Sequence, residues 1–125
     1  MQISKTGYVD EAEKVIENLK KDRNGDFLLT TSKIRNLLAM SNDIYTQIIN
    51  TQSTHLDEDI QSRIEYLRVR FVYECGRDEG VMDFAEKAKL LTILKEIDDS
   101  KDNYCLFNNY MEALVAFHRY HKGKN

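Results

Sequence analysis

Apolar residues recur three and four positions apart along most of the chain, with polar residues between them. The first such segment contains Val9, Ala12, Val15, Ile16 and Leu19. This spacing places its apolar side chains on one face of an amphipathic helix. No proline interrupts the pattern, and glycines are few, so long helices are expected. The pattern predicts helices over about Tyr8 to Asp22, Thr31 to Asn50, Asp59 to Cys75, Val81 to Ile97 and Asn103 to His121.

These elements predict an all-α fold, a single compact bundle of about five helices, with residues 1–125 forming one domain. The length of 125 residues and the hydrophobic share of 42% suit one domain with its own core. The sequence has no apolar run of the roughly 18 residues that cross a bilayer, and its N-terminus lacks the apolar core of a signal peptide. We therefore expect a cytoplasmic protein without membrane contact.

The sequence offers little for catalysis or metal binding. It contains no P-loop, GxSxG or HExxH motif, so we predict neither an enzyme nor a cofactor. Cys75 and Cys105 lack the spacing of a redox or zinc motif and are expected in the core. His118 and His121 share a helix face, but the nearby acid, Glu112, is too far along the helix to complete a metal site. We predict no metal site.

The third predicted helix has apolar residues on two sides. Its core stripe is expected to contain Ile60, Ile64, Leu67, Phe71 and Cys75, while Tyr66, Val69 and Tyr73 lie on nearly the opposite side. A helix that is apolar on two faces must pack between neighbours or meet a partner.

Arginines border these two faces. Arg63, Arg70 and Arg77 repeat every seven residues and form a column about 21 Å long, enough to touch several phosphates of one strand. The alternative is that Arg70 and Arg77 pair with Glu74 on the same helix. Arg68 projects near the core stripe, so it must reach a carboxylate or carbonyl inside the fold or extend its head to a groove.

Two other helix ends carry cations. Lys33 and Arg35 lie in the first turn of the second predicted helix, where the dipole and unpaired N–H groups disfavour positive charge. An anion held there would reverse that effect, although the residues could equally be exposed without a ligand. Arg119 lies near the end of the last helix, where the dipole alone accounts for a cation.

The charge of the whole chain is acidic, with a net charge of -3 at pH 7, which argues against a free-standing nucleic-acid binder. The charge is unevenly spread: residues 60–77 hold four arginines against two glutamates, whereas residues 78–102 hold eight acids against four lysines. One face could therefore bind an anion while the rest repels it.

Four segments together resemble the small, all-helical subunit of the type III-A CRISPR-Cas effector, the Csm complex. They are FLLTTSKIRNLL at 27–38, RIEYLRVRFVYECGR at 63–77, FAEKAKLLTILKEI at 84–97 and YMEALVAFHRY at 110–120. The resemblance implies a non-catalytic subunit that stacks head to tail with copies of itself, beside other Csm subunits and along the guide–target RNA duplex. Contacts to guide and target RNA would be independent of sequence, because guide pairing already reads the sequence.

The resemblance also implies which residues contact RNA. Lys33, Arg35, Arg68 and Arg77 match basic positions of that family, and we add Arg70 and Arg119 as further candidates. The competing hypothesis is a helical protein-interaction module without nucleic-acid contact, in which the arginines are neutralised by acids and Tyr66, Val69 and Tyr73 meet a partner.

Overall fold

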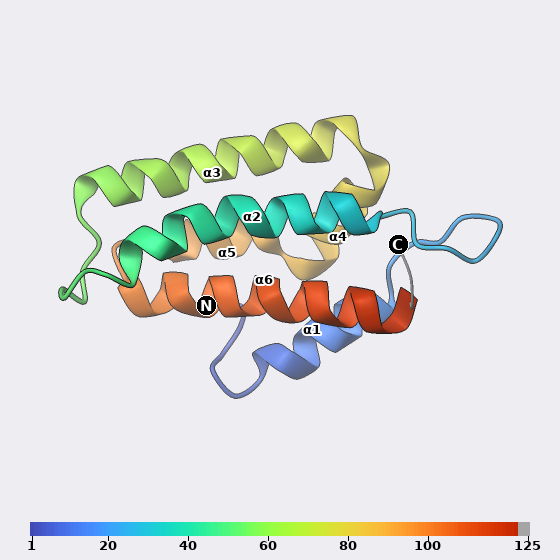
Figure 1. Ribbon diagram of the computed structural model, residues 1–125, viewed down its shortest axis with the longest axis horizontal. Coiled ribbons are helices and arrows are strands. Elements are labelled where there is room, and N and C mark those ends of the chain that lie inside the picture. Colours follow the sequence, from blue (N-terminus) through green and yellow to red (C-terminus); the bar gives the residue numbers. More distant parts are fainter. Residues whose placement is uncertain (123–125) are drawn as a thin grey trace.

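The structure is a computed structural model that describes residues 1–122. Within these residues it contains six α-helices and no strand, apart from isolated bridges between Lys21 and Phe27 and between His55 and Ser100 (Figure 1). The all-α prediction is confirmed, although the helix count is six. The helices are α1 (Tyr8–Glu17), α2 (Thr31–Ile48), α3 (Glu58–Arg77), α4 (Glu79–Ala88), α5 (Leu90–Glu96) and α6 (Lys101–Lys122).

The sixth helix arises because the predicted helix from Val81 to Ile97 is broken at Lys89. Lys89 has a left-handed backbone with φ 59°, and its N–H bonds to the carbonyls of Ala85 and Glu86. A left-handed residue ends a helix, and glycine or asparagine is its usual sequence signature. Because lysine occupies the position here, the sequence pattern predicted one continuous helix.

The first helix is also shorter than predicted, since α1 ends at Glu17 rather than near Asp22. The chain then makes a turn in which the Asp22 carboxylate accepts bonds from the N–H groups of Asn24 and Asp26. Gly25 lies within this turn, with φ 84°. Local side-chain hydrogen bonds of this kind compete with helix formation, which explains the early end. The third helix, in contrast, runs through Gly76 to Arg77.

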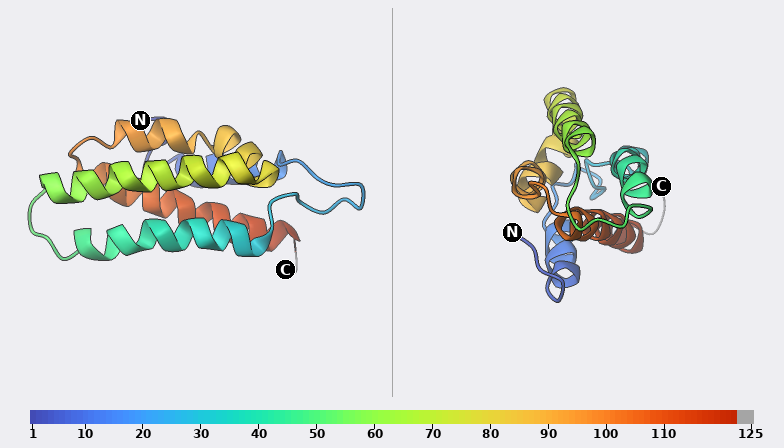
Figure 2. Two further views of the ribbon diagram at one scale, coloured as in Figure 1. Left: turned by 90° about the horizontal axis from the view of Figure 1, so that it is seen from above. Right: turned by 90° about the vertical axis from the view of Figure 1, so that its left-hand side faces the viewer.

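The three longest helices, α2, α3 and α6, run along the length of the molecule. Figure 1 shows α2 between α3 and α6, and Figure 2 shows from two further sides how α4 and α5 lie against α3. Helix α1 packs against α6. The core between these elements contains five large aromatic side chains that are almost fully buried, Phe71, Phe84, Tyr104, Phe107 and Tyr110.

A small polar network joins α2 to α6 inside this core. The Ser41 hydroxyl donates to Asn108, whose amide donates to Asn42, and the Tyr104 hydroxyl donates to the Ser41 carbonyl at 2.8 Å. Burial raises the pKa of Tyr104, because the charged phenolate would lose its hydration there. Polar groups that are satisfied in this way favour one register between the two helices.

The predicted faces of α3 are confirmed. Ile64, Leu67, Phe71 and Cys75 are buried and Ile60 is half-buried, whereas Tyr66, Val69 and Tyr73 are exposed by 62%, 60% and 59%. Both cysteines are free thiols; Cys75 is buried and Cys105 is half-buried. Within residues 1–122, no helix combines the length and apolarity that a membrane span needs.

Candidate nucleic-acid interface

The N-terminus of α2 carries positive charge without a compensating acid. Thr30 caps the helix, its Oγ1 accepting the Lys33 N–H at 3.3 Å. The first turn of α2 contains no acidic residue, whereas those of α1, α3, α4 and α6 each contain at least one. Lys33 is half-buried and Arg35 is exposed. The end of the dipole that attracts anions is therefore surrounded by cations, which strengthens that attraction.

Arg35 and Arg119 meet at this helix end although they lie far apart in the sequence. Both line a cavity of about 300 Å³ between α2 and α6, together with Thr31, Ile34, Val115 and His118. Arg35 and Thr31 also line a neighbouring hollow of about 250 Å³ with Thr30 and Ser32. The structure thus joins two of the predicted residues into one site, which we call the α2–α6 pocket.

A hydroxyl in the wall of the α2–α6 pocket has no hydrogen-bond partner within residues 1–122. Thr31 is only 7% exposed, and its Oγ1 is buried without a hydrogen bond to any described residue. Nearby, His118 fixes the segment that leads into α2, since its Nε2 donates to the Leu29 carbonyl at 2.8 Å. A buried hydroxyl without a partner is unfavourable by about 1–3 kcal/mol, which a ligand oxygen would relieve.

A second group of cations lies in a groove between α2 and α3. Arg63 and Arg70 line this groove of about 430 Å³, together with Met40, Asp43, Ile44, Ser62, Tyr66 and Leu67. Arg70 makes no ion pair with Glu74 in the part of the chain that the structure describes, so the predicted pairing is absent for this arginine. The groove combines two guanidinium groups, the Asp43 carboxylate, one exposed aromatic ring and apolar side chains.

The remaining two arginines of α3 are engaged by carboxylates. Arg68 donates to Glu65 from Nε at 3.1 Å and from Nη2 at 2.9 Å, so it meets an exposed acid on its own helix rather than one inside the fold. Arg77 lies 3.7 Å from the buried Glu74 carboxylate, as the competing hypothesis expected, and its guanidinium stacks 5.4 Å from the Tyr73 ring centre. Both are less available to a ligand than Arg35 or Arg70.

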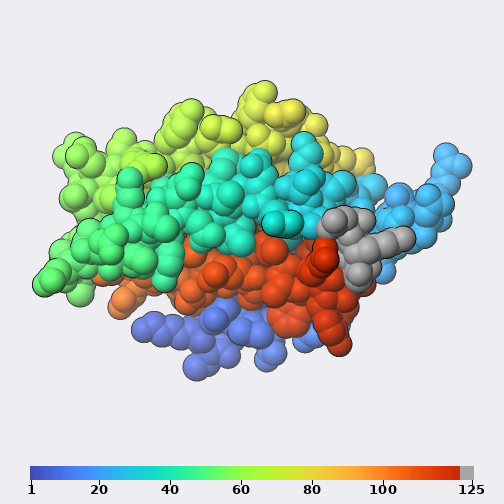
Figure 3. All heavy atoms as spheres, in the orientation of Figure 1, coloured from blue at the N-terminus to red at the C-terminus, as the bar shows by residue number. Residues whose placement is uncertain are grey.

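Most of the candidate positions belong to one end of the molecule. Because α2 runs opposite to α3 and α6, its start lies beside the ends of those two helices (Figure 1). That end holds Lys33, Arg35, Arg77 and Arg119, while Arg70 lies away from it, about two turns before the end of α3. Figure 3 shows the face on which α2 is flanked by α3 and α6. Four of the six candidate cations therefore lie toward one end of the molecule, on three different helices.

Comparison with known proteins places this arrangement in a family. A sequence model described as Csm2 Type III-A matches residues 4–124. The chain belongs to the Csm2 type III-A family. It is 45% identical over 118 residues to a Streptococcus thermophilus protein named CRISPR system Cms protein Csm2, covering 94% of this chain and 93% of that protein.

Two further relatives with the same printed name agree. A Mycobacterium tuberculosis protein is 40% identical over 120 residues, covering 96% of this chain and 95% of its own length. An Enterococcus italicus protein is 38% identical over 135 residues, covering 95% of this chain and 94% of that protein. The Csm2 match spans all six candidate residues, and it confirms the resemblance to the Csm small subunit.

Reasoning from the sequence missed two features of the site. The sequence has Thr30, Thr31 and Ser32 in a row and does not distinguish their roles, whereas the structure shows that Thr30 caps α2 and that the buried Thr31 hydroxyl has no partner among residues 1–122. Arg63 was part of the predicted column but was not carried forward as an RNA-contacting candidate, and it shares a groove with Arg70. Its spacing of seven residues from Arg70, which places both arginines on one side of α3, is the sequence signal that would have included it.

Proposed function

We propose that this chain is a non-catalytic small subunit of the cytoplasmic type III-A CRISPR effector complex. It stacks with copies of itself and with other Csm subunits, and it contacts the backbone of the guide–target RNA duplex through basic residues. The observation that carries the proposal is the α2–α6 pocket, where Arg35, Arg119 and the Thr31 hydroxyl converge on a helix N-terminus.

This pocket has the chemistry of a phosphate site. Helix N–H groups and the positive end of the dipole attract an anion, and guanidinium groups bind phosphate oxygens through paired hydrogen bonds. Arg35 and Arg119 line the cavity from two different helices, so a phosphate between them would be held from two sides. None of these groups reads a base edge, so the contact would be independent of sequence.

The α2–α3 groove supplies a second contact for the same strand. Arg63 and Arg70 would hold a further phosphate, while the exposed Tyr66 ring offers a surface for a sugar or base. The net charge of -3 is compatible with this role, because several copies bound along one RNA contribute their contacts jointly.

The exposed apolar side of α3 supports contact with neighbouring subunits. Tyr66, Val69, Val72 and Tyr73 are each more than half exposed on this helix. Exposed aromatic and apolar side chains at this density are typical of protein interfaces. The same feature, with the ion pairs of Arg68 and Arg77, favours the alternative of a protein-interaction module without RNA contact.

One comparison within the assembled complex separates these two functions. We expect Arg35→Ala with Arg119→Ala to reduce target RNA retention by about tenfold or more, because two charge-assisted phosphate contacts are lost. Lys5→Ala with Lys95→Ala removes the same charge from exposed positions outside the pocket and is the matched control. Equal retention by the two double variants, with complex assembly intact, would support the protein-interaction module instead.

A further inference from the structure

A second charged site lies at the ends of two parallel helices. Figure 1 shows α1 and α6 packed together and running in the same direction. Glu17 is the last residue of α1 and His121 lies in the last turn of α6. The negative ends of both helix dipoles therefore meet here, and each of them favours a cation nearby.

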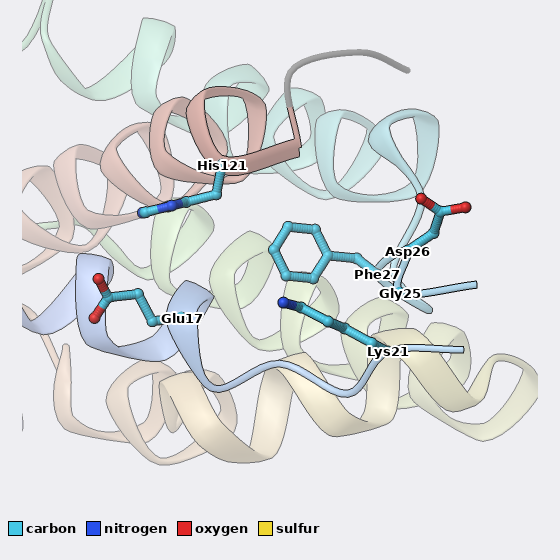
Figure 4. Close-up of a pocket in the computed structure, with 6 residues that line it drawn as sticks. All are labelled: Glu17, Lys21, Gly25, Asp26, Phe27 and His121. Carbon is cyan, nitrogen blue, oxygen red and sulfur yellow. The ribbon is translucent and has the colours of Figure 1, made fainter. Parts of the chain in front are cut away.

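Three metal-ligating side chains converge at this corner. One carboxylate oxygen each of Glu13 and Glu17 and one ring nitrogen of His121 lie within 4.8 Å of one another. Glu13 is half-buried, and the other two are exposed. Figure 4 shows Glu17 and His121 on facing helices beside a cavity of about 250 Å³, which Lys21, Asp26 and Phe27 also line.

The local charges are unfavourable without a cation. Glu13 and Glu17 are four residues apart on one helix, a spacing at which like charges repel. They also lie toward the negative end of α1, where carboxylates are disfavoured. Within residues 1–122, neither carboxylate forms an ion pair; Lys21, which lines the same cavity, holds its ammonium 5.5 Å from the centre of the Phe27 ring. A bound cation would reverse each of these effects.

The histidine is oriented by its neighbours on α6. The His121 ring stacks on Phe117 with 6.3 Å between ring centres and meets the edge of Tyr120 at 5.2 Å. A ring that is already held loses little freedom on binding a ligand. The two glutamates, being partly or fully exposed, can rotate toward it, which the metal bonds of about 2.0–2.2 Å require.

We propose that Glu13, Glu17 and His121 bind a divalent transition-metal ion of the Zn²⁺ type. Imidazole nitrogen and carboxylate oxygen are both Zn²⁺ ligands, and three protein ligands leave the fourth position of a tetrahedral site open to water. The imidazole disfavours Mg²⁺ and Ca²⁺, which prefer oxygen ligands throughout. The ion would link the end of α1 to the end of α6, and this role is independent of RNA contact.

Calorimetric titration of the full chain with ZnCl₂ tests the proposal. We expect one Zn²⁺ per chain and a higher Tm in its presence, because a ligand that binds only the folded state stabilises it. His121→Gln and Glu17→Gln should each weaken Zn²⁺ binding by at least tenfold, while Mg²⁺ at the same concentration should leave Tm unchanged. His55→Gln is the matched control, because His55 also faces an acid, Asp99 at 3.1 Å, but without a third ligand.

Two results would overturn the proposal. One is the absence of Zn²⁺ binding by the unmodified chain. The other is binding that His121→Gln leaves unchanged, which would place the ion elsewhere. The absorption spectrum of the Co²⁺-loaded chain distinguishes the free cysteines as alternative ligands, because thiolate coordination produces a strong near-ultraviolet band. We expect that band to be absent, and its presence would assign the metal to a cysteine.

Discussion

The start of α2 differs from the starts of α3 and α4 in how its charge is balanced. Asp57 and Asp78 cap α3 and α4, accepting backbone N–H groups at 2.8 Å and 2.9 Å, so each positive helix end receives a carboxylate from its own chain. Helix α2 instead has a neutral cap at Thr30 and cations at Lys33 and Arg35. A helix end that its own sequence leaves uncompensated is available to an external anion, whereas a self-compensated end serves stability alone.

The largest effect on stability is expected at a helix start that is capped by a carboxylate of the same chain. Asp78→Ala removes the carboxylate that accepts the Val81 N–H, so it should lower the free energy of unfolding by about 1–2 kcal/mol in urea denaturation. Asp59→Ala removes an exposed acid from the first turn of α3 without removing a cap, and it is expected to lower stability by only a few tenths of a kcal/mol. Equal losses in the two variants would contradict the distinction between capping and mere proximity.

Thr31→Val separates ligand binding from stability at the uncompensated end. Valine has the shape of threonine but no hydroxyl, so it removes a buried group without a partner and should raise the free energy of unfolding by about 1 kcal/mol. The same variant should weaken RNA retention by the assembled complex. Thr46→Val is the control, since its hydroxyl is exposed and bonds to the Asp43 carbonyl. A destabilised Thr31→Val chain would show that the hydroxyl already has a partner.

Lys33→Glu tests the same end by reversing its charge. A glutamate three residues after the Thr30 cap completes a capping box and matches the dipole, so the isolated chain should gain about 0.3–1 kcal/mol in thermal or urea unfolding. RNA retention should fall in parallel. Lys95→Glu makes the same change in the last turn of α5 and should have the opposite sign, a small loss of stability. A loss of stability in both variants would contradict the explanation based on the helix dipole.

The smallest effect is expected at the end of α1. In a metal-free buffer with a chelator, Glu17→Gln relieves repulsion from Glu13 and should raise the free energy of unfolding by about 0.2–0.5 kcal/mol. Glu112→Gln removes an exposed acid from the middle of α6 and serves as the control. With added Zn²⁺, the unmodified chain should become more stable to unfolding than the Glu17→Gln variant. A variant that stays the more stable of the two would count against the metal site.

The long helices were predictable from the sequence because their apolar periodicity reflects the core directly. Helix α2 begins at the predicted Thr31, and α3 and α6 extend only one or two residues beyond their predicted limits. The break at Lys89 was not predictable, because lysine carries no local signal for the left-handed backbone that it adopts between the buried Ala88 and Leu90. Tertiary packing overrides local propensity at such positions.

The candidate site was predictable one residue at a time but not as a site. The charges and positions of Lys33, Arg35, Arg70, Arg77 and Arg119 along the predicted helices suggested each of them individually. Helical periodicity placed Arg68 near the core, and it is half-buried. The convergence of Arg35 with Arg119 depends on α2 and α6 packing in opposite directions, which no local pattern reveals. The sequence also paired His121 with His118, whereas the structure places it beside Glu13 and Glu17 on another helix.

The salt dependence of target RNA retention by the assembled complex tests the central claim most directly. Each phosphate contact contributes about 0.7 to the slope of log K against log salt concentration for a single strand and about 0.9 for a double helix. If Arg35 and Arg119 each contact a phosphate, their double alanine variant should have a slope shallower by about 1–2 than that of the unmodified complex. A variant complex that retains RNA with the unmodified slope would show that the α2–α6 pocket does not hold the RNA backbone.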